Sequence, residues 1–312
     1  MAASLHIHPA LRELAQQAAG LPSMSQVSPA QARAGIAART ASRPRGPQVA
    51  NVFELEIAAE AGVIPARVYD PGSAAGVVAA FHGGGWLMGS RESFDATCRH
   101  LAIDSGLAVV NIDYRLAPEH PFPAAFDDAW AAVCWIAEHA TQFGWPQDRL
   151  GVFGESAGAN LAAAICLMAR NRQAPRILAQ ALVYPPTDAL LTAASLDTYA
   201  EGFLQRTADV KYAFATYALD QGVSPTDWRL SPLHAKTHAG LPRTLVITAE
   251  CDAVRDDGEA YAAKLAEAGV DVACVRYLGM LHTFYGMRGT LEAASVAQRQ
   301  VADMLRTALV EG

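Results

Sequence analysis

Short runs of nearly uninterrupted apolar residues recur along the chain and alternate with longer stretches of helical periodicity. The apolar runs lie at residues 76–81, 107–114, 150–153, 177–184, 244–250 and 272–278. Runs of this length are typical of strands buried on both faces of a parallel sheet. Helical patterns separate them, at residues 94–104, 123–142, 159–172, 256–268 and 291–309. The alternation predicts an α/β fold in which helices cover both faces of a mostly parallel sheet.

Three segments depart from this alternation. Residues 52–60 and 64–70 alternate in part between polar and apolar positions and predict a hairpin. Residues 1–48 predict two short helices, followed by the breaker sequence RPRGP. Residues 187–235 separate two predicted strands and carry helical and aromatic patterns. Because so long an insertion in a compact domain is usually functional, we expect a lid there.

The composition indicates a chain with a large core, since 52% of the 312 residues are apolar and 18% are charged. This length fits one large α/β domain or two domains. The formal net charge of −7 argues against a nucleic-acid partner, which usually needs a basic face. The first residues lack the pattern of a secretion signal, and no apolar run reaches the roughly 18 residues that span a bilayer. We therefore expect a soluble cytoplasmic protein with no membrane partner.

The cysteines favour the same compartment. They are five in number, widely spaced and without a CxxC pair, at Cys98, Cys134, Cys166, Cys251 and Cys274. This pattern favours buried thiols in a reducing compartment over disulfides or a metal site.

The sequence RLGVFGESAGANLAAAICL at 149–167 runs from an apolar stretch through Gly-Glu-Ser-Ala-Gly into an alanine-rich stretch. A strand, Gly-x-Ser-x-Gly and a helix form the context of a nucleophile elbow. The helix N-terminus behind the serine offers free N–H groups and a positive dipole end to a developing anion. We interpret Ser156 as a nucleophile; the alternative is a small residue in a tight turn.

A second motif, FHGGGWLMG at 81–89, directly follows a predicted strand. Three consecutive glycines cost conformational entropy, but they let backbone N–H groups approach a ligand closely. An HGGG loop is a known oxyanion-hole element of lipases and esterases. The candidate donors are the N–H groups of Gly84, Gly85 and Ala157. A flexible turn or a phosphate cradle is the alternative, although the usual phosphate-binding patterns are absent.

A serine nucleophile needs a base, and the base needs an orienting acid. Among nine histidines, His282 follows the last predicted strand on a short loop, GMLHTFYG, where the active sites of such sheets form. Asp252 directly follows the strand before it. Asp256 is the runner-up, because carboxylates at a helix start are commonly caps. The chain order Ser156, Asp252, His282 is the one expected for an α/β-hydrolase.

Together these motifs resemble the hormone-sensitive-lipase-like esterases, the bacterial family IV esterases of the α/β-hydrolase superfamily. The resemblance covers nearly the whole chain. The motifs that carry it are HGGGW at 82–86, DYRLAPEHPFPAA at 113–125, GESAGANLAA from Gly154, AEGFL at 200–204, DAVRDDGEAYAAKLAEAGV at 252–270 and GMLHTFYG at 279–286.

The resemblance implies an eight-stranded, mostly parallel sheet with one antiparallel strand near its start. It implies a core formed by residues 49–186 and 236–312. The cap would combine the helices of 1–48 with the insertion at 187–235. Members of the family are often dimers, so a homodimer is a further expectation.

The resemblance also implies roles for individual residues. Ser156 would be the nucleophile, His282 the general base and Asp252 its orienting partner. Gly84, Gly85 and Ala157 would form the oxyanion hole. The expected substrates are small-molecule esters with short to medium acyl chains, and no metal or organic cofactor is needed. We expect cap side chains and Trp86 to wall an apolar acyl pocket; the candidates are Trp86, Phe203, Leu204 and Phe214.

Two positions depart from the family pattern, which usually has Asp where this chain has Glu155 and often has Gly where it has Ala159. Glu155 keeps the charge but adds a methylene, so local hydrogen bonds could shift. We expect Asp113, Arg115 and Glu119 of the DYRLAPEH motif to form a polar network that supports the oxyanion loop; ordinary surface charges are the alternative.

The functional hypothesis is a serine carboxylesterase. An amidase or arylformamidase of the same fold is the first alternative, because HGGxW loops occur there too. A non-catalytic small-molecule receptor is the second, since plant gibberellin receptors resemble this family. Those receptors lose the catalytic histidine, whereas His282 is present here.

Overall fold

The computed structural model describes residues 7–311 and contains one eight-stranded sheet with the strand order β1-β2-β4-β3-β5-β6-β7-β8. Only β2 runs against the other strands, because it pairs antiparallel with both β1 and β4. The strands are β1 Asn51–Ala59, β2 Gly62–Asp70, β3 Val77–Phe81, β4 Ala108–Ile112, β5 Leu150–Glu155, β6 Ala179–Val183, β7 Arg243–Cys251 and β8 Val272–Leu281. The expected mostly parallel, eight-stranded sheet is confirmed. The predicted hairpin is also confirmed, as β1 and β2.

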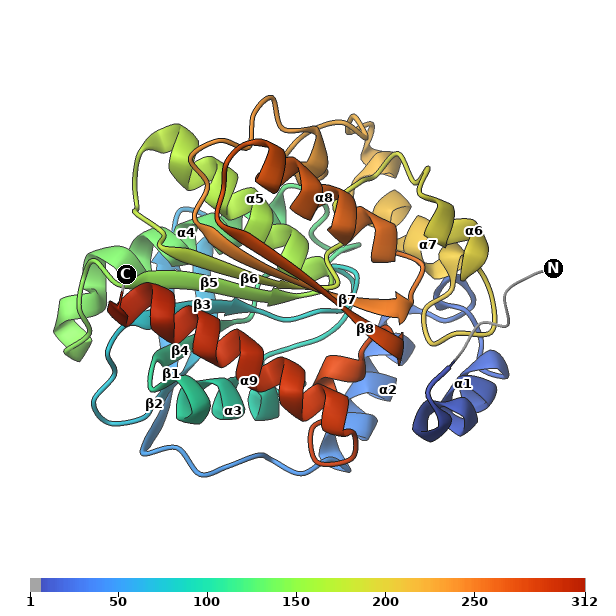
Figure 1. The fold of residues 1–312 in the computed structure, drawn as a ribbon, viewed down its shortest axis with the longest axis horizontal. Helices are drawn as coiled ribbons and strands as arrows, with labels where there is room; N and C mark the ends of the chain where they lie inside the picture. The colour runs from blue at the N-terminus through green and yellow to red at the C-terminus, as the bar shows by residue number, and fades with distance from the viewer. Residues whose placement is uncertain (1–6, 312) are drawn as a thin grey trace.

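Helices cover both faces of the sheet (Figure 1). The α-helices are α1 Arg12–Ala19, α2 Pro29–Ala41, α3 Asp95–Ser105, α4 Ala124–His139, α5 Ala157–Arg172, α6 Ala194–Thr198, α7 Thr207–Tyr217, α8 Arg255–Glu267 and α9 Glu292–Arg306. Short 3-10 helices are η1 Pro9–Leu11, η2 Met24–Gln26, η3 Ala140–Phe143, η4 Leu219–Gln221, η5 Pro232–His234 and η6 Phe284–Gly286, and a π-helical turn, η7 Thr307–Glu311, ends the described chain.

The core has two layers, one on each side of the sheet. Along β3, Val77, Ala79 and Phe81 belong to one buried cluster, and Val78 and Ala80 belong to the other. This follows from the geometry of a strand, in which successive side chains point to opposite faces. The first cluster includes residues of α4, α5 and α8, and the second includes residues of α3 and α9. The apolar runs of the sequence are therefore strands buried on both faces, as expected.

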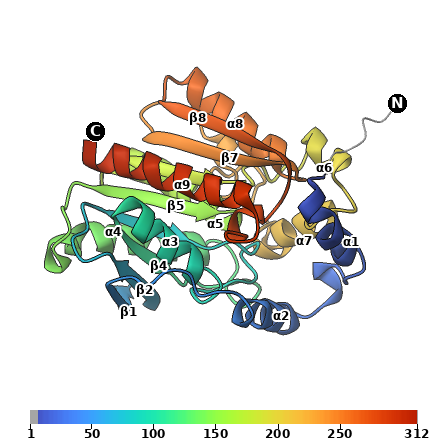
Figure 2. The ribbon, with the colours of Figure 1, turned by 60° about the horizontal axis from the view of Figure 1, so that its bottom comes forward.

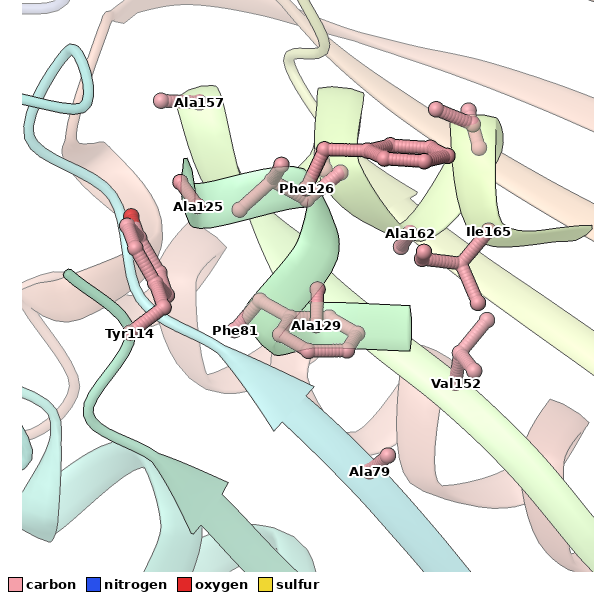
Figure 3. Close-up of a cluster of buried hydrophobic side chains, with 14 of the residues drawn as sticks. Ala79, Phe81, Tyr114, Ala125, Phe126, Ala129, Val152, Ala157, Ala162 and Ile165 are labelled. Atoms are coloured by element: carbon pink, nitrogen blue, oxygen red, sulfur yellow. The ribbon is translucent and has the colours of Figure 1, made fainter. Parts of the chain in front are cut away.

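Small side chains bring α5 close to the sheet. Figure 3 shows Ala162 and Ile165 of α5 near Val152 of β5, with Ala129 of α4 beside them. Ile165 and Val152 are fully buried, and such burial contributes about 1.5–3 kcal/mol for a side chain of this size. This packing fixes α5 and with it the turn that precedes the helix.

The N-terminal helices and the insertion between β6 and β7 lie together at the end of the sheet toward which β7 and β8 point (Figure 1). Figure 2 shows α1 beside α6 and α7 from a second direction. The guanidinium of Arg206, just before α7, donates to the carbonyls of Ala18 at 3.0 Å and Leu21 at 2.8 Å. The N–H of Met24 donates to Asp209 of α7 at 2.6 Å. These contacts tie the two segments together; residues 1–6 of the expected N-terminal segment lie outside the described residues.

Two side chains attach these segments to the rest of the fold. The guanidinium of Arg33 in α2 donates to the carbonyls of Leu87 and Ala117, at 2.9 Å each, and pairs with Glu119. The buried amide of Asn160 in α5 donates to the carbonyls of Pro186 and Leu230, near the two ends of the insertion. The insertion is therefore fastened at both ends to the helix that carries the elbow.

The cysteines are only partly as expected. Cys98, Cys166 and Cys251 are buried, but Cys134 is half-buried and Cys274 is exposed. Cys274 lies on β8, a strand at the edge of the sheet, and an edge strand leaves part of its surface to solvent. Within residues 7–311, no helix is long and apolar enough to cross a membrane, and no three His, Cys, Asp or Glu side chains are grouped to hold a metal ion.

Candidate active site

Ser156 stands at a sharp turn between β5 and α5. Its backbone has φ 55° and ψ −122°, a combination that costs energy in a residue with a side chain. The turn is held by the N–H of Ser156, which donates to the carbonyl of Val183 at 2.9 Å, and by the carbonyl of Ser156, which accepts from Ala159 at 2.8 Å. Such strain persists only where the surroundings enforce it, and here the packed strand and helix do so.

The two glycines that flank this serine are required by close backbone approach. A Cβ atom at Gly154 would lie 2.1 Å from the carbonyl oxygen of Gly158. A Cβ atom at Gly158 would lie 2.1 Å from the carbonyl oxygen of Phe81, at the end of β3. The Gly-x-Ser-x-Gly pattern is therefore a steric requirement of this turn.

The structure brings Ser156, His282 and Asp252 together as one chain of hydrogen bonds. His282 Nε2 lies 3.0 Å from Ser156 Oγ, and His282 Nδ1 lies 2.7 Å from Asp252 Oδ2. Asp252 Oδ1 accepts from the N–H of Val254 at 3.1 Å, which fixes the orientation of the carboxylate. All three side chains are buried. With Nδ1–H donating to the carboxylate, Nε2 is free to accept the serine proton.

Asp256, the alternative acid, has a different partner. Its Oδ2 accepts from the N–H of Ser195 at 2.9 Å, and its Oδ1 pairs with Arg255. Ser195 lies in α6, so Asp256 fastens the insertion to the start of α8. The geometry therefore favours Asp252 over Asp256 as the partner of His282.

The glycine loop passes directly beside the elbow. A Cβ atom at Gly83 would lie 3.3 Å from the Cβ of Ser156. Gly84 has φ 127°, and a Cβ there would lie 2.1 Å from the carbonyl oxygen of Met88. Gly85 and Ala157 line a pocket together with Ser156. Ala157 is the first residue of α5, so its N–H lacks a partner within the helix and can serve a ligand.

His82 braces this loop. Its Nδ1 donates to the carbonyl of Gly83 at 2.9 Å, and its ring stacks on Tyr114 with centroids 4.3 Å apart. The hydroxyl of Tyr114 donates to the carbonyl of His82 at 2.7 Å. Burial lowers the pKa of His82 below its usual value, which favours the neutral ring.

The expected polar network of Asp113, Arg115 and Glu119 is only partly as predicted, because the three side chains pair with other residues rather than with one another. Each of the three side chains has a partner elsewhere in the chain: Asp113 accepts from the N–H of Arg91, Arg115 pairs with Asp128, and Glu119 pairs with Arg33. Two of the three still support the glycine loop: Asp113 Oδ1 lies 4.0 Å from His82 Nε2, and Glu119 pairs with Arg33, whose guanidinium donates to the carbonyl of Leu87.

The pocket above Ser156 contains some of the expected residues and not others. Its lining comprises Gly85, Trp86, Ser156, Ala157, Pro186, Gln205, Val210, Ala213 and Phe214. Trp86 and Phe214 were expected. Phe203 and Leu204 are not in the lining; Phe203 is buried against Tyr199, with ring centroids 5.2 Å apart. Sequence reasoning missed Pro186, Gln205, Val210 and Ala213, which no motif marks.

Glu155, the residue before the serine, is half-buried near the same histidine. Its Oε1 accepts from the hydroxyl of Tyr184 at 2.5 Å. Burial raises the pKa of the Glu155 carboxyl, while the hydrogen bond from Tyr184 and the nearby His282 oppose this rise. Burial also raises the pKa of Tyr184 well above its usual value, so the phenol remains a donor.

Comparison with known proteins agrees with this fold. Residues 78–286 match the family model described as the alpha/beta hydrolase fold. The chain is 43% identical to the carboxylic ester hydrolase LipN of Mycobacterium tuberculosis over 78% of its own length and 66% of the relative's length. It is 40% identical to the esterase LipI of the same organism, over 83% and 82% of the two lengths. A solved thermostable esterase from Pseudomonas putida shares 34% identity, with a TM-score of 0.91 over 98% of this chain and 99% of that one.

The chain therefore belongs to the α/β-hydrolase fold family. Within that family, the predicted resemblance to the hormone-sensitive-lipase-like esterases is confirmed by the similarity to these relatives.

Proposed function

We propose that this α/β hydrolase cleaves carboxylic esters through an acyl-enzyme intermediate on Ser156. The observation that carries the proposal is the continuous hydrogen-bonded chain from Ser156 Oγ through His282 to Asp252. An isolated serine hydroxyl is a weak nucleophile near neutral pH, and a base within hydrogen-bond distance removes this limitation. The esterase names of the relatives support the same reaction class.

In the first half of the reaction, Ser156 Oγ attacks the ester carbonyl while His282 Nε2 takes its proton. The negative charge that develops on the carbonyl oxygen is stabilised by the N–H groups of Gly84, Gly85 and Ala157. Removal of one such donor in a comparable site costs about 2.7–4 kcal/mol. The tetrahedral intermediate then collapses, and the alcohol leaves with the proton from His282.

In the second half, His282 activates water, which attacks the acyl carbonyl. The acid is released, and Ser156 recovers its proton. Asp252 keeps the imidazole in the tautomer that these transfers need and stabilises its charged form. No step requires a metal ion or an organic cofactor.

We also propose that residues 7–48 and 187–235 act together as a cap over the site. The hydrogen bonds of Arg206 and Asp209 to the N-terminal segment support this division. The pocket lining supports it too, because Gln205, Val210, Ala213 and Phe214 all come from the insertion.

The test compares Ser156→Ala with wild type on a short-chain 4-nitrophenyl ester and with a fluorophosphonate probe. Loss of a nucleophilic serine costs on the order of 10⁴-fold or more in kcat, so hydrolysis and labelling should both disappear. Ser42→Ala, at an exposed position after α2, is the matched control and should keep both. Substantial hydrolysis by Ser156→Ala would disprove the mechanism.

A further inference from the structure

Gln205 is a polar residue in an otherwise mostly apolar part of the pocket wall. The cap contributes Val210, Ala213 and Phe214 beside it, and Pro186 lies at the base of the insertion. All of these residues share the pocket with Ser156. A polar group placed among apolar ones in a ligand pocket usually fixes the orientation or identity of the ligand.

The side-chain oxygen of Gln205 has no partner within the protein. Oε1 is buried and accepts no hydrogen bond from the described residues. A buried carbonyl that lacks a donor destabilises the folded state, so such a group needs an explanation. Trp86 Nε1, on another residue of the same pocket, is also buried without a partner. Two residues of the pocket lining thus each carry a buried polar atom without a partner among the described residues, one an acceptor and the other a donor.

The backbone on the C-terminal side of Gln205 is held firmly. The guanidinium of Arg206 donates to the carbonyls of Ala18, Ala19 and Leu21. The hydroxyl of Thr207 donates to the carbonyl of Leu196 at 2.5 Å. These anchors hold the backbone that follows Gln205 and so keep this residue at the pocket wall. Preorganisation of this kind is what a specificity-determining residue requires.

We propose that Gln205 is a specificity-determining residue whose amide binds a hydroxyl group of the substrate. The pocket would then favour hydroxyl-bearing esters over the same esters without the hydroxyl. The inference rests on the proposed esterase function and adds the substrate class. A hydroxyl both donates and accepts, so it can pair with the amide in either orientation of the side chain. An ester without the hydroxyl would leave the amide buried and unpaired, and sites of this kind discriminate strongly against such analogues.

The test measures kcat/KM for two matched pairs of esters. Ethyl 3-hydroxybutanoate, as each enantiomer, is compared with ethyl butanoate, and 3-hydroxypropyl butanoate is compared with propyl butanoate. The first pair places the hydroxyl on the acyl half and the second on the alcohol half. The variant is Gln205→Met, which keeps an unbranched side chain of similar length without the amide. Gln221→Met, at an exposed glutamine of the same insertion, is the matched control.

We expect the ratio of hydroxylated to plain ester to fall about tenfold or more in Gln205→Met in one of the two pairs, and to stay at the wild-type value in Gln221→Met. The pair that responds identifies the half of the substrate that Gln205 binds. Unchanged ratios in both pairs would overturn the inference, as would a wild-type preference for the plain ester in both. If Gln205→Met does not fold, Gln205→Leu and the wild-type ratios decide the question. Wild type that hydrolyses none of these esters would instead contradict the proposed function.

Discussion

Tyr184 connects the carboxylate of Glu155 to the imidazole of His282. Its hydroxyl donates to Glu155 Oε1 at 2.5 Å, and its ring lies against the ring of His282 with centroids 4.3 Å apart. Tyr184 is fully buried and has a positive φ of 37°, so its position is enforced by its surroundings. The extra methylene of Glu155, where the family pattern has Asp, is thus accommodated by a specific partner.

Replacement of Tyr184 by Phe should destabilise the protein. The change keeps the ring beside His282 but leaves the half-buried Glu155 carboxyl without its donor, at a cost of about 1–3 kcal/mol in the free energy of unfolding. Urea unfolding would measure this loss. Glu155→Gln should cost less, because an amide oxygen can still accept from Tyr184. The double variant completes a cycle, and strict additivity of the two losses would contradict the coupling.

Asp252 and Asp256 should respond very differently to conversion to Asn. In Asp252→Asn the amide cannot hold His282 in the same tautomer, and the corresponding change in a serine protease lowers kcat about 10⁴-fold. We therefore expect a loss of several orders of magnitude for Asp252→Asn in ester hydrolysis. Asp256→Asn should keep most of the activity, since Asp256 binds Ser195 and Arg255. Similar losses in both variants would argue against the assignment of the acid.

Gly158→Ala should not be tolerated. The added Cβ would meet the carbonyl oxygen of Phe81 at 2.1 Å, and neither β3 nor α5 can move without disturbing the core. We expect a loss of stability above about 3 kcal/mol, or failure to fold, as measured by thermal unfolding. Ala159→Gly, which restores the residue frequent in the family, is the neighbouring control and should cost only about 1 kcal/mol. An active, stable Gly158→Ala protein would contradict the steric account of the elbow.

Arg33→Ala should destabilise the protein more than Glu119→Gln. Arg33 also donates to the carbonyls of Leu87 and Ala117, so its removal frees more than one partner. We expect a loss of about 1–2 kcal/mol for Arg33→Ala. Glu119→Gln should lose at most about 1 kcal/mol, because a largely exposed ion pair contributes little. Equal losses in chemical denaturation would mean that only the ion pair matters.

The buried His238 predicts a pH dependence of stability. Burial lowers the pKa of His238 in the folded protein, and its Nε2 donates to the carbonyl of Pro232. Below pH of about 6.5 the unfolded chain binds a proton at this histidine more readily than the folded protein, so acidification favours unfolding. His238→Gln removes this pH-dependent contribution to the free energy of unfolding. As the pH falls from 7.5 to 5.5, the free energy of unfolding of the variant should rise relative to that of wild type, by no more than about 1.4 kcal/mol. A constant difference in stability between the variant and wild type across this pH range would show that His238 is not the titrating group.

Local sequence signals were sufficient to predict much of the fold. Buried strands leave continuous apolar runs, and the run at 150–153 became the start of β5. The elbow was recognisable because its two glycines stand at fixed positions around the serine: Gly154 is required by the nearby carbonyl of Gly158, and Gly158 by the carbonyl of Phe81 in β3. The partner of Ser156 was also predictable, since residues that follow parallel strands meet at one edge of the sheet.

The pocket wall was not predictable in the same way. Phe203 has an aromatic side chain of the kind expected in an apolar pocket, yet it packs on Tyr199. Which side of the insertion faces Ser156 depends on Arg206 and Asp209, whose partners are in the N-terminal segment. The same holds for Glu119, whose partner Arg33 is far away in sequence. Contacts between distant segments are set by the assembled fold and leave no local pattern.

The anchors of the N-terminal segment also constrain the order in which the molecule can assemble. The carbonyls of Ala18 and Leu21 have their partner in Arg206, and Met24 has its partner in Asp209. During synthesis the first helices emerge long before these partners exist, because chains leave the ribosome from the N-terminus. The earliest part of the chain must therefore wait for most of the sheet to be made, and docking of this segment is a late event in folding.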